Sequence, residues 1–255
     1  MPGNEEKVVS FFCGIIEKNL NLNLPIIGDL KRIAVPTNDG PFEITTESDL
    51  NNFSSNDRYK KADIYLNGKG ISLKEASAPL YNKIQRKHIK GLLNHLLDDP
   101  KRSEEILADL DTAIERVNQG SKRDIPWKNI FSKSEFYSIL EFLMMEGYSD
   151  LKISLHPAEL ILIAPKVPTL KNTHEIQVFS FEKFFKEYED KIVIAARRIW
   201  LGNKSKSENN RAKSQLKPPE NQPWVYKNIS GNPREWDPEF PKDQRREIFY
   251  LNINT

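Results

Sequence analysis

The sequence predicts an α/β fold of the α+β kind, in which helices flank a mixed β-sheet. Three observations carry this prediction: apolar residues recur at helical spacing near the start of the chain, short β-rich segments follow, and helical spacing then returns. With 255 residues the chain can bury a sizeable core, as one large domain or two small ones. We expect one region at residues 1–130 and another at 131–255, packed together as one compact unit.

The first expected elements are a helix, two short strands and a hairpin. Asn4 can cap a helix over about residues 5–18, since acidic residues begin it and apolar residues follow at amphipathic spacing. Residues 32–36 and 42–46 are typical of short strands, which can form the mixed sheet together with a hairpin at 62–75.

The hairpin is predicted from Asn67-Gly68, because a type I′ turn needs positive φ at both central residues. A turn at these residues sets Asp63 opposite Ser72, whereas a turn one residue later sets Asp63 opposite Lys74. Side chains alternate along a strand, so either register gives one apolar face and one polar face. The polar face would carry Asp63, Tyr65, Ser72 and Lys74.

Helices and strands then alternate to the end of the chain. Pro79 opens an expected helix to about Leu97 with a lysine-rich outer face. A second helix follows Ser103 and stops at Gly120, and Ser132 with Glu135 forms a capping box for a third, which ends at Gly147. The remaining expected elements are a strand hairpin at 150–155 and 158–164, a strand near 175–180, a long helix at 181–200 and a last strand at 249–253.

The polar face of the hairpin allows two interpretations. Asp63 and Lys74 could form a cross-strand ion pair, worth at most about 1 kcal/mol when exposed. The surrounding segment favours chemistry instead, because residues 58–90 contain nine lysines and arginines against two acids. A carboxylate in such a positive field suits a metal ion that must meet a polyanion.

The motif of Asp63 followed by Ser72-Leu73-Lys74 resembles the PD-(D/E)xK nuclease signature, in the variant where a serine replaces the second acid. Several type II restriction endonucleases carry that variant, and the segments PLYNKIQR, HPAELILIAPK and FPKDQRREIFYLNI are also similar to parts of restriction endonuclease sequences. The resemblance implies a restriction-endonuclease-like catalytic core in residues 1–130 and a basic recognition region in 131–255. It further implies sequence-specific hydrolysis of double-stranded DNA with Mg²⁺, which leaves 5′-phosphates.

On this resemblance Asp63 is a metal ligand, Lys74 orients or deprotonates the attacking water and neutralises the phosphate, and Ser72 replaces the second acid. Because a divalent hard cation prefers several oxygen ligands including carboxylates, another acid must contribute. In S-x-K enzymes this acid comes from the helix after the lysine strand, which here contains none before Asp98. The candidate is Glu47, with Glu43 and Glu75 as alternatives; Glu75 would need a bulge to reach the metal.

DNA contacts are expected in two basic regions. On the helix after the hairpin, Gln85 and Arg86 could touch the scissile phosphate and Lys87 the DNA backbone; a solvated helix face is the alternative. Residues 197–217 hold seven lysines and arginines against one acid, and could be a disordered loop or a recognition loop from about Gly202 to Pro223. Candidate DNA-binding side chains in and beyond it are Asn209, Asn210, Arg211, Gln215 and Arg234.

Several functional classes lose support from the sequence. There is no apolar segment long enough to span a bilayer, so a cytoplasmic protein without a membrane role is expected. The chain has one cysteine, no zinc-type spacing, no phosphate-binding glycine loop and no nucleophile elbow. The competing function is a non-catalytic DNA-binding protein in which Asp63 and Lys74 form a structural ion pair. A palindromic DNA site would favour a homodimer, although a monomer that cuts the strands in turn is the alternative.

Overall fold

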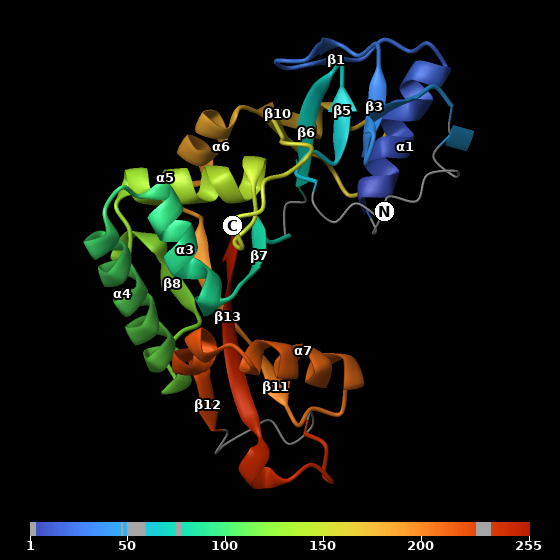
Figure 1. The fold of residues 1–255 in the computed structure, drawn as a ribbon. Coiled ribbons are helices and arrows are strands. Elements are labelled where there is room, and N and C mark those ends of the chain that lie inside the picture. The colour runs from blue at the N-terminus through green and yellow to red at the C-terminus, as the bar shows by residue number, and fades with distance from the viewer. Residues whose placement is uncertain (1–3, 47, 50–59, 75–77, 228–235) are drawn as a thin grey trace.

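The computed structural model describes residues 4–46, 48–49, 60–74, 78–227 and 236–255. Its fold is mixed α/β, as predicted, with helices around multi-stranded sheets. Figure 1 shows one sheet with helix α1 (Asn4–Glu17) in one part of the molecule, and a second sheet with most of the other helices in the other part. Among the described residues, no helix combines the length and the apolar character that crossing a membrane requires.

The first sheet has the strand order β10-β9-β6-β5-β3-β4. Strands β3 to β6 pair antiparallel, and the sequence predicts all four of them. Strand β9 pairs with β6 in parallel, which makes the sheet mixed. Helix α1 covers one face through an apolar stripe that includes Val9, Phe12 and Cys13. The strands are β3 (Ile33–Thr37), β4 (Gly40–Ile44), β5 (Ile64–Leu66), β6 (Lys69–Lys74), β9 (Leu160–Ile163) and β10 (Gln177–Phe179), with the small ribbon β1 (Asn23–Leu24) and β2 (Gly28–Asp29) nearby.

The second sheet is built on one long strand pair. Strands β11 (Val193–Leu201) and β13 (Arg246–Asn254) pair antiparallel along their full length. The pair is extended by β7 (Tyr81–Ile84), β8 (Asp124–Pro126) and β12 (Val225–Lys227). Helix α7 (Lys206–Leu216) packs on one face through Ala212, and the main core lies on the other.

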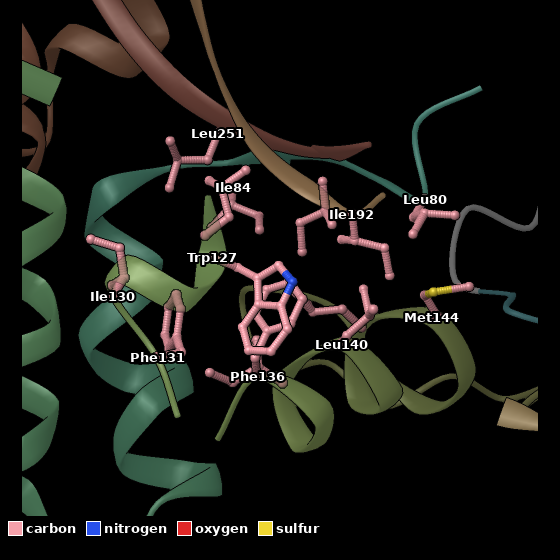
Figure 2. Packing of buried hydrophobic residues seen from close by; sticks show 14 of the residues in the cluster. Leu80, Ile84, Trp127, Ile130, Phe131, Phe136, Leu140, Met144, Ile192 and Leu251 are labelled. Carbon is pink, nitrogen blue, oxygen red and sulfur yellow. The ribbon is translucent and has the colours of Figure 1, made fainter. Parts of the chain in front are cut away.

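The main core gathers around Trp127, as Figure 2 shows. The Trp127 ring stacks on Phe136, with centroids 4.6 Å apart and an angle of 6° between the planes. Its indole N–H donates to the carbonyl of Glu189 at 2.9 Å, so the ring is buried without an unsatisfied donor. The helices that close this core are α3 (Arg86–Leu96), α4 (Pro100–Asn118), α5 (Lys133–Glu141), the π-helical turn η2 (Phe142–Glu146) and α6 (Phe181–Tyr188).

Short 3₁₀ turns complete the described structure. They are η1 (Trp127–Asn129), η3 (Thr173–Glu175), η4 (Pro219–Trp224) and η5 (Lys242–Gln244). The predicted capping box is confirmed at the start of α5, where Ser132 and Glu135 each bond the other's backbone N–H. Helix α4 begins at Pro100, before the predicted Ser103, because the side chain of Asp99 caps it.

Four sequence-based predictions of local structure are wrong. The helix expected from Pro79 begins only at Arg86, because residues 81–84 form β7 against β13. The helix expected over 181–200 ends at Tyr188, and β11 follows. Residues 150–155 form no strand beyond the isolated bridge between Gly147 and Ile153. The loop expected over 197–217 is the end of β11 followed by α7.

The boundary expected near residue 130 does not separate the two sheets. The first sheet takes β9 and β10 from beyond residue 130, whereas the second takes β7 and β8 from before it. The chain therefore crosses between the two parts more than once.

Candidate functional site

The hairpin of β5 and β6 forms in the first of its two predicted registers. Tyr65 pairs with Gly70 and Leu66 with Lys69, which leaves the turn to Asn67 and Gly68. Both turn residues have positive φ, 51° and 86°, as a type I′ turn needs. The strand pairing ends at Ile64, opposite Ile71. The backbone N–H of Asp63 donates to the carbonyl of Ile71 at 2.8 Å, so the regular register does not continue to a pair of Asp63 with Ser72.

A pocket of about 420 Å³ lies at the ends of β5 and β6 that are away from the turn, and Tyr65 of the predicted polar face lines a different pocket. Its polar lining includes all three residues of the predicted motif, together with two lysines that precede it. These polar residues are Lys60, Lys61, Asp63, Ser72 and Lys74. Apolar walls come from distant segments, among them Leu80, Leu143, Met144 and Leu162. The structure therefore brings Asp63, Ser72 and Lys74 together, as the sequence predicts.

The Asp63 carboxylate is held in a fixed orientation. Its Oδ2 accepts a hydrogen bond from the backbone N–H of Leu73 at 2.7 Å. Burial raises the pKa of Asp63, and the charge of Lys74 and this hydrogen bond oppose the shift. Ser72, on the facing strand, is only 1 % exposed.

Lys61 is a pocket residue that the sequence analysis did not single out. Its side chain is buried, and its Nζ donates to the carbonyl of Leu143 at 2.7 Å. The Nζ also lies 3.8 Å from the ring centre of Tyr148 and 4.8 Å from that of Tyr81. Burial, and then the charge of Lys74, lower the pKa of Lys61 to about 7, while Asp63 raises it. No local pattern in the sequence identifies Lys61, because Leu143 and Tyr148, which contact its amine, lie far along the chain.

The charged groups of the pocket are near one another without direct ion pairs. Among the ion pairs of the described residues, none includes Lys60, Lys61, Asp63 or Lys74. Lys74 nevertheless affects the pKa of both Asp63 and Lys61, so the charges lie within electrostatic reach. These groups therefore face a shared space that a charged ligand could fill.

The residues that line this pocket fit a metal ion only in part. Within the described ranges, no group of three or more histidine, cysteine, aspartate or glutamate side chains is placed to hold a metal ion. Asp63 is the one carboxylate among the described lining residues. Mg²⁺ is often held by one or two carboxylates, with water and substrate phosphate in its other positions, so Asp63 meets the lower limit of this requirement.

The proposed second acid is not found among the described residues of the pocket. Glu47 and Glu75 lie outside the part of the chain that the structure describes. Glu43 is described and lies on the edge strand β4, where it is exposed and lines a different pocket with Arg32 and Tyr65. The structure therefore does not bring Glu43 to Asp63.

Arg86 contacts protein groups instead of facing the pocket. It forms a double hydrogen bond with Asp111 of α4, both at 2.7 Å, and donates to the carbonyl of Glu220 at 2.6 Å. Asp111 also accepts from the indole N–H of Trp224. Gln85 precedes α3 and bonds Asn221, and neither Gln85 nor Arg86 lines the pocket. The expected contact with a scissile phosphate is therefore replaced by a role in joining α3, α4 and η4.

Lys87, which the sequence predicts to contact the DNA backbone, is accessible in the structure. Its side chain is exposed, and only its backbone N–H is engaged, with Asn221. It lies next to Arg86 on α3, which makes the pair suitable for a matched comparison.

Substitution of Arg86 by methionine is expected to destabilise the fold by about 2 to 4 kcal/mol, because a partly buried Asp111 loses its ion-pair partner. Urea unfolding of Arg86→Met and Lys87→Met measures this, and the Lys87 variant should stay within about 0.5 kcal/mol of the unsubstituted protein. Unchanged stability of Arg86→Met with weaker DNA binding would restore Arg86 as a DNA contact.

The predicted base-reading residues divide into two groups on and around α7. Asn209 faces inward, where its Oδ1 accepts from the backbone N–H groups of Gly202 and Asn203, and Gln215 is buried. Asn210 and Arg211 are exposed on the helix. Arg234 lies outside the described residues. Of the described candidates in this region, Asn210 and Arg211 are therefore the ones that DNA could reach.

Comparison with protein-family models, with curated proteins and with solved structures gives no match to this chain. The functional argument therefore rests on the pocket itself.

Proposed function

We propose that this chain is a divalent-metal-dependent DNA endonuclease of the restriction type, with its active site in the pocket around Asp63. The observation that carries the proposal is the convergence of one aspartate and three lysines on a single pocket without ion pairs among them. A structural ion pair of Asp63 and Lys74, which the competing DNA-binding function assumes, is not among the ion pairs of the described residues.

In this proposal each pocket residue has a distinct role. Asp63 would hold Mg²⁺, an ion that offsets charge on the phosphorane and lowers the pKa of an attacking water. Lys74 orients that water and neutralises the phosphate, as the resemblance to the S-x-K nucleases implies. Ser72 lines the pocket and is buried, and it stands where the resemblance puts the serine that replaces the second acid.

The order of elements also supports the proposal. A helix, antiparallel strands and then a further helix is the order that the nuclease core needs, and α1, β3 to β6 and α3 follow it along the chain. Exposed Lys87 can contribute backbone contacts, whereas Asn210 and Arg211 can contribute base contacts. A palindromic site would make the active form a homodimer with two such pockets.

The test is an assay with supercoiled plasmid in the presence of Mg²⁺, with EDTA as the control. We expect conversion to nicked and then linear DNA with Mg²⁺ and none with EDTA. End labelling of the products should find 5′-phosphates. DNA binding without any cleavage, across Mg²⁺ and Mn²⁺, would instead favour the non-catalytic DNA-binding protein.

A further inference from the structure

Strand β7 contains a bulge next to the pocket. Its register with β13 shifts between Leu251 and Ile253, so that two residues of β7, Asn82 and Lys83, stand against Asn252 alone. Asn82 lines the pocket, and Figure 1 shows β7 beside the end of β13 that carries the C-terminus. Bulges are common beside active sites, where they redirect a side chain.

Lys83 has a backbone conformation that lysine rarely adopts. Its φ is 62°, in the left-handed region, where a side chain crowds its own backbone and glycine is preferred. The backbone N–H of Lys83 donates to Oδ1 of Asn252 at 3.0 Å, and Asn252 is buried. This hydrogen bond from inside the sheet helps to hold Lys83 in its strained conformation. Strain of this kind is concentrated at functional sites.

Packing does not explain why a lysine occupies this position. The residue is exposed, and no ion pair of the described residues includes its Nζ. Glycine would adopt the same φ without strain, so the fold alone does not favour lysine at the bulge. The ammonium of Lys83 is therefore available to a ligand.

A polar face of the second sheet continues from the bulge. On the side of β13 away from the main core, three successive positions are polar: Tyr250, Asn252 and Asn254. Arg197 of β11 stands opposite Tyr250. In the amide orientation that satisfies both of its polar atoms, Asn254 accepts from Nη2 of Arg197 at 3.1 Å. Polar side chains therefore extend from Lys83 to Arg197.

Helix α7 borders the same face. Burial raises the pKa of Tyr250, and the charges of Arg211 and Arg197 oppose the shift, so both arginines lie within electrostatic reach of its hydroxyl. Two acids accompany them: Glu208, which adds to the shift, and Asp124 on β8, beyond β11. Basic side chains thus stand at both ends of the polar face, at the bulge and beside α7.

We propose that Lys83 binds the phosphate backbone of duplex DNA, and that the DNA engaged at the pocket passes over this polar face toward Arg197 and α7. The inference rests on the proposed function for the identity of its ligand, and adds a contact outside the pocket. DNA fits better than a small anion, because the basic groups are spread along the face and a small anion would need them at one point.

The salt dependence of DNA binding tests this contact. Each phosphate contact contributes about 0.9 to the slope of log affinity against log salt concentration. A labelled duplex of random sequence, with Ca²⁺ in place of Mg²⁺, serves as the probe because phosphate contacts do not depend on sequence. For Lys83→Gly we expect a slope shallower by about one, and affinity about five- to tenfold lower at 0.1 M salt.

Two further variants separate charge from backbone strain. Ile26 is also exposed and also has a positive φ, 68°, but it lies between β1 and β2, outside the pocket. Lys83→Gly and Ile26→Gly should both keep or raise Tm, because relief of strain offsets the added freedom of the unfolded chain. Only Lys83→Gly should lose affinity for DNA. Lys83→Arg keeps the positive charge and should keep the salt slope.

The possible results distinguish this inference from the proposed function. An unchanged slope for Lys83→Gly, the same loss in Ile26→Gly, or an equal loss in Lys83→Arg would overturn the inference, even in a protein that cleaves DNA. A slope that falls by about one, in a protein that binds DNA but does not cleave it, would support the inference and refute the nuclease. No DNA binding by the unsubstituted protein would overturn both.

Discussion

Asp63→Asn is expected to lower Mg²⁺-dependent DNA cleavage by about 1000-fold, because several kcal/mol of transition-state charge stabilisation depend on the metal that this carboxylate would hold. An amide oxygen can still accept the hydrogen bond from the backbone N–H of Leu73, so the local structure should remain. Burial already raises the pKa of Asp63, and an uncharged amide removes this unfavourable buried charge. Plasmid cleavage and thermal unfolding, measured on the same preparation, check both expectations.

The matched control is Asp39→Asn, because Asp39 is an exposed aspartate of the turn between β3 and β4, in the same sheet. It should cleave at the normal rate. DNA binding by Asp63→Asn in Ca²⁺ should be close to normal, since phosphate contacts by lysines supply most of the affinity. Undiminished cleavage by a folded Asp63→Asn protein would refute the active-site assignment.

Lys74→Met should reduce cleavage by about 100-fold while DNA binding changes little. A positioned group that orients or deprotonates the attacking water typically contributes a factor of this size or more. Methionine retains an unbranched side chain of similar length, so the pocket keeps its shape. Single-turnover cleavage with saturating enzyme separates this loss in the chemical step from any change in affinity.

Lys31→Met is the control for Lys74, because it removes one exposed lysine from the same part of the molecule without touching the pocket. It should behave as the unsubstituted protein does. If Lys74→Met and Lys31→Met lose the same small factor, Lys74 contributes only to the general positive field and the proposed role at the water is wrong.

Sequence patterns correctly predicted the secondary-structure elements that are determined by residues close together in the chain. The Asn67-Gly68 turn fixes the hairpin register through two residues with positive φ, and the capping box at Ser132 fixes the start of α5. The failures have a distant cause. The apolar spacing of residues 181–188 continues through residues 189–200, which suggested one long helix. These residues form β11 instead, because every residue of β11 pairs with a residue of β13, about fifty residues away in the chain.

The candidate site shows the same difference between features with a local cause and features with a distant cause. Asp63, Ser72 and Lys74 line one pocket because the short Asn67-Gly68 turn brings Asp63, just before β5, beside the end of β6. Lys61 was missed because its environment is made by Leu143 and Tyr148, which no local pattern connects to it. The sequence predicted a phosphate contact for Arg86 because its partner Asp111 lies on another helix. A sequence does not distinguish an exposed basic residue from one that forms an ion pair with a distant acid.

The parallel pairing of β6 with β9 bears on the order in which the chain folds. The β5–β6 hairpin closes through a two-residue turn, an event of about microseconds, whereas β9 reaches β6 only after the intervening helices have closed a much longer loop. Leu143 and Leu162, which line the pocket, reach it only when β9 pairs with β6. An intermediate with the hairpin alone would therefore display the aspartate and its lysines in water, with the basicity of ordinary side chains. Until β9 docks, such an intermediate would attract polyanions but lack the enclosure on which the proposed chemistry depends.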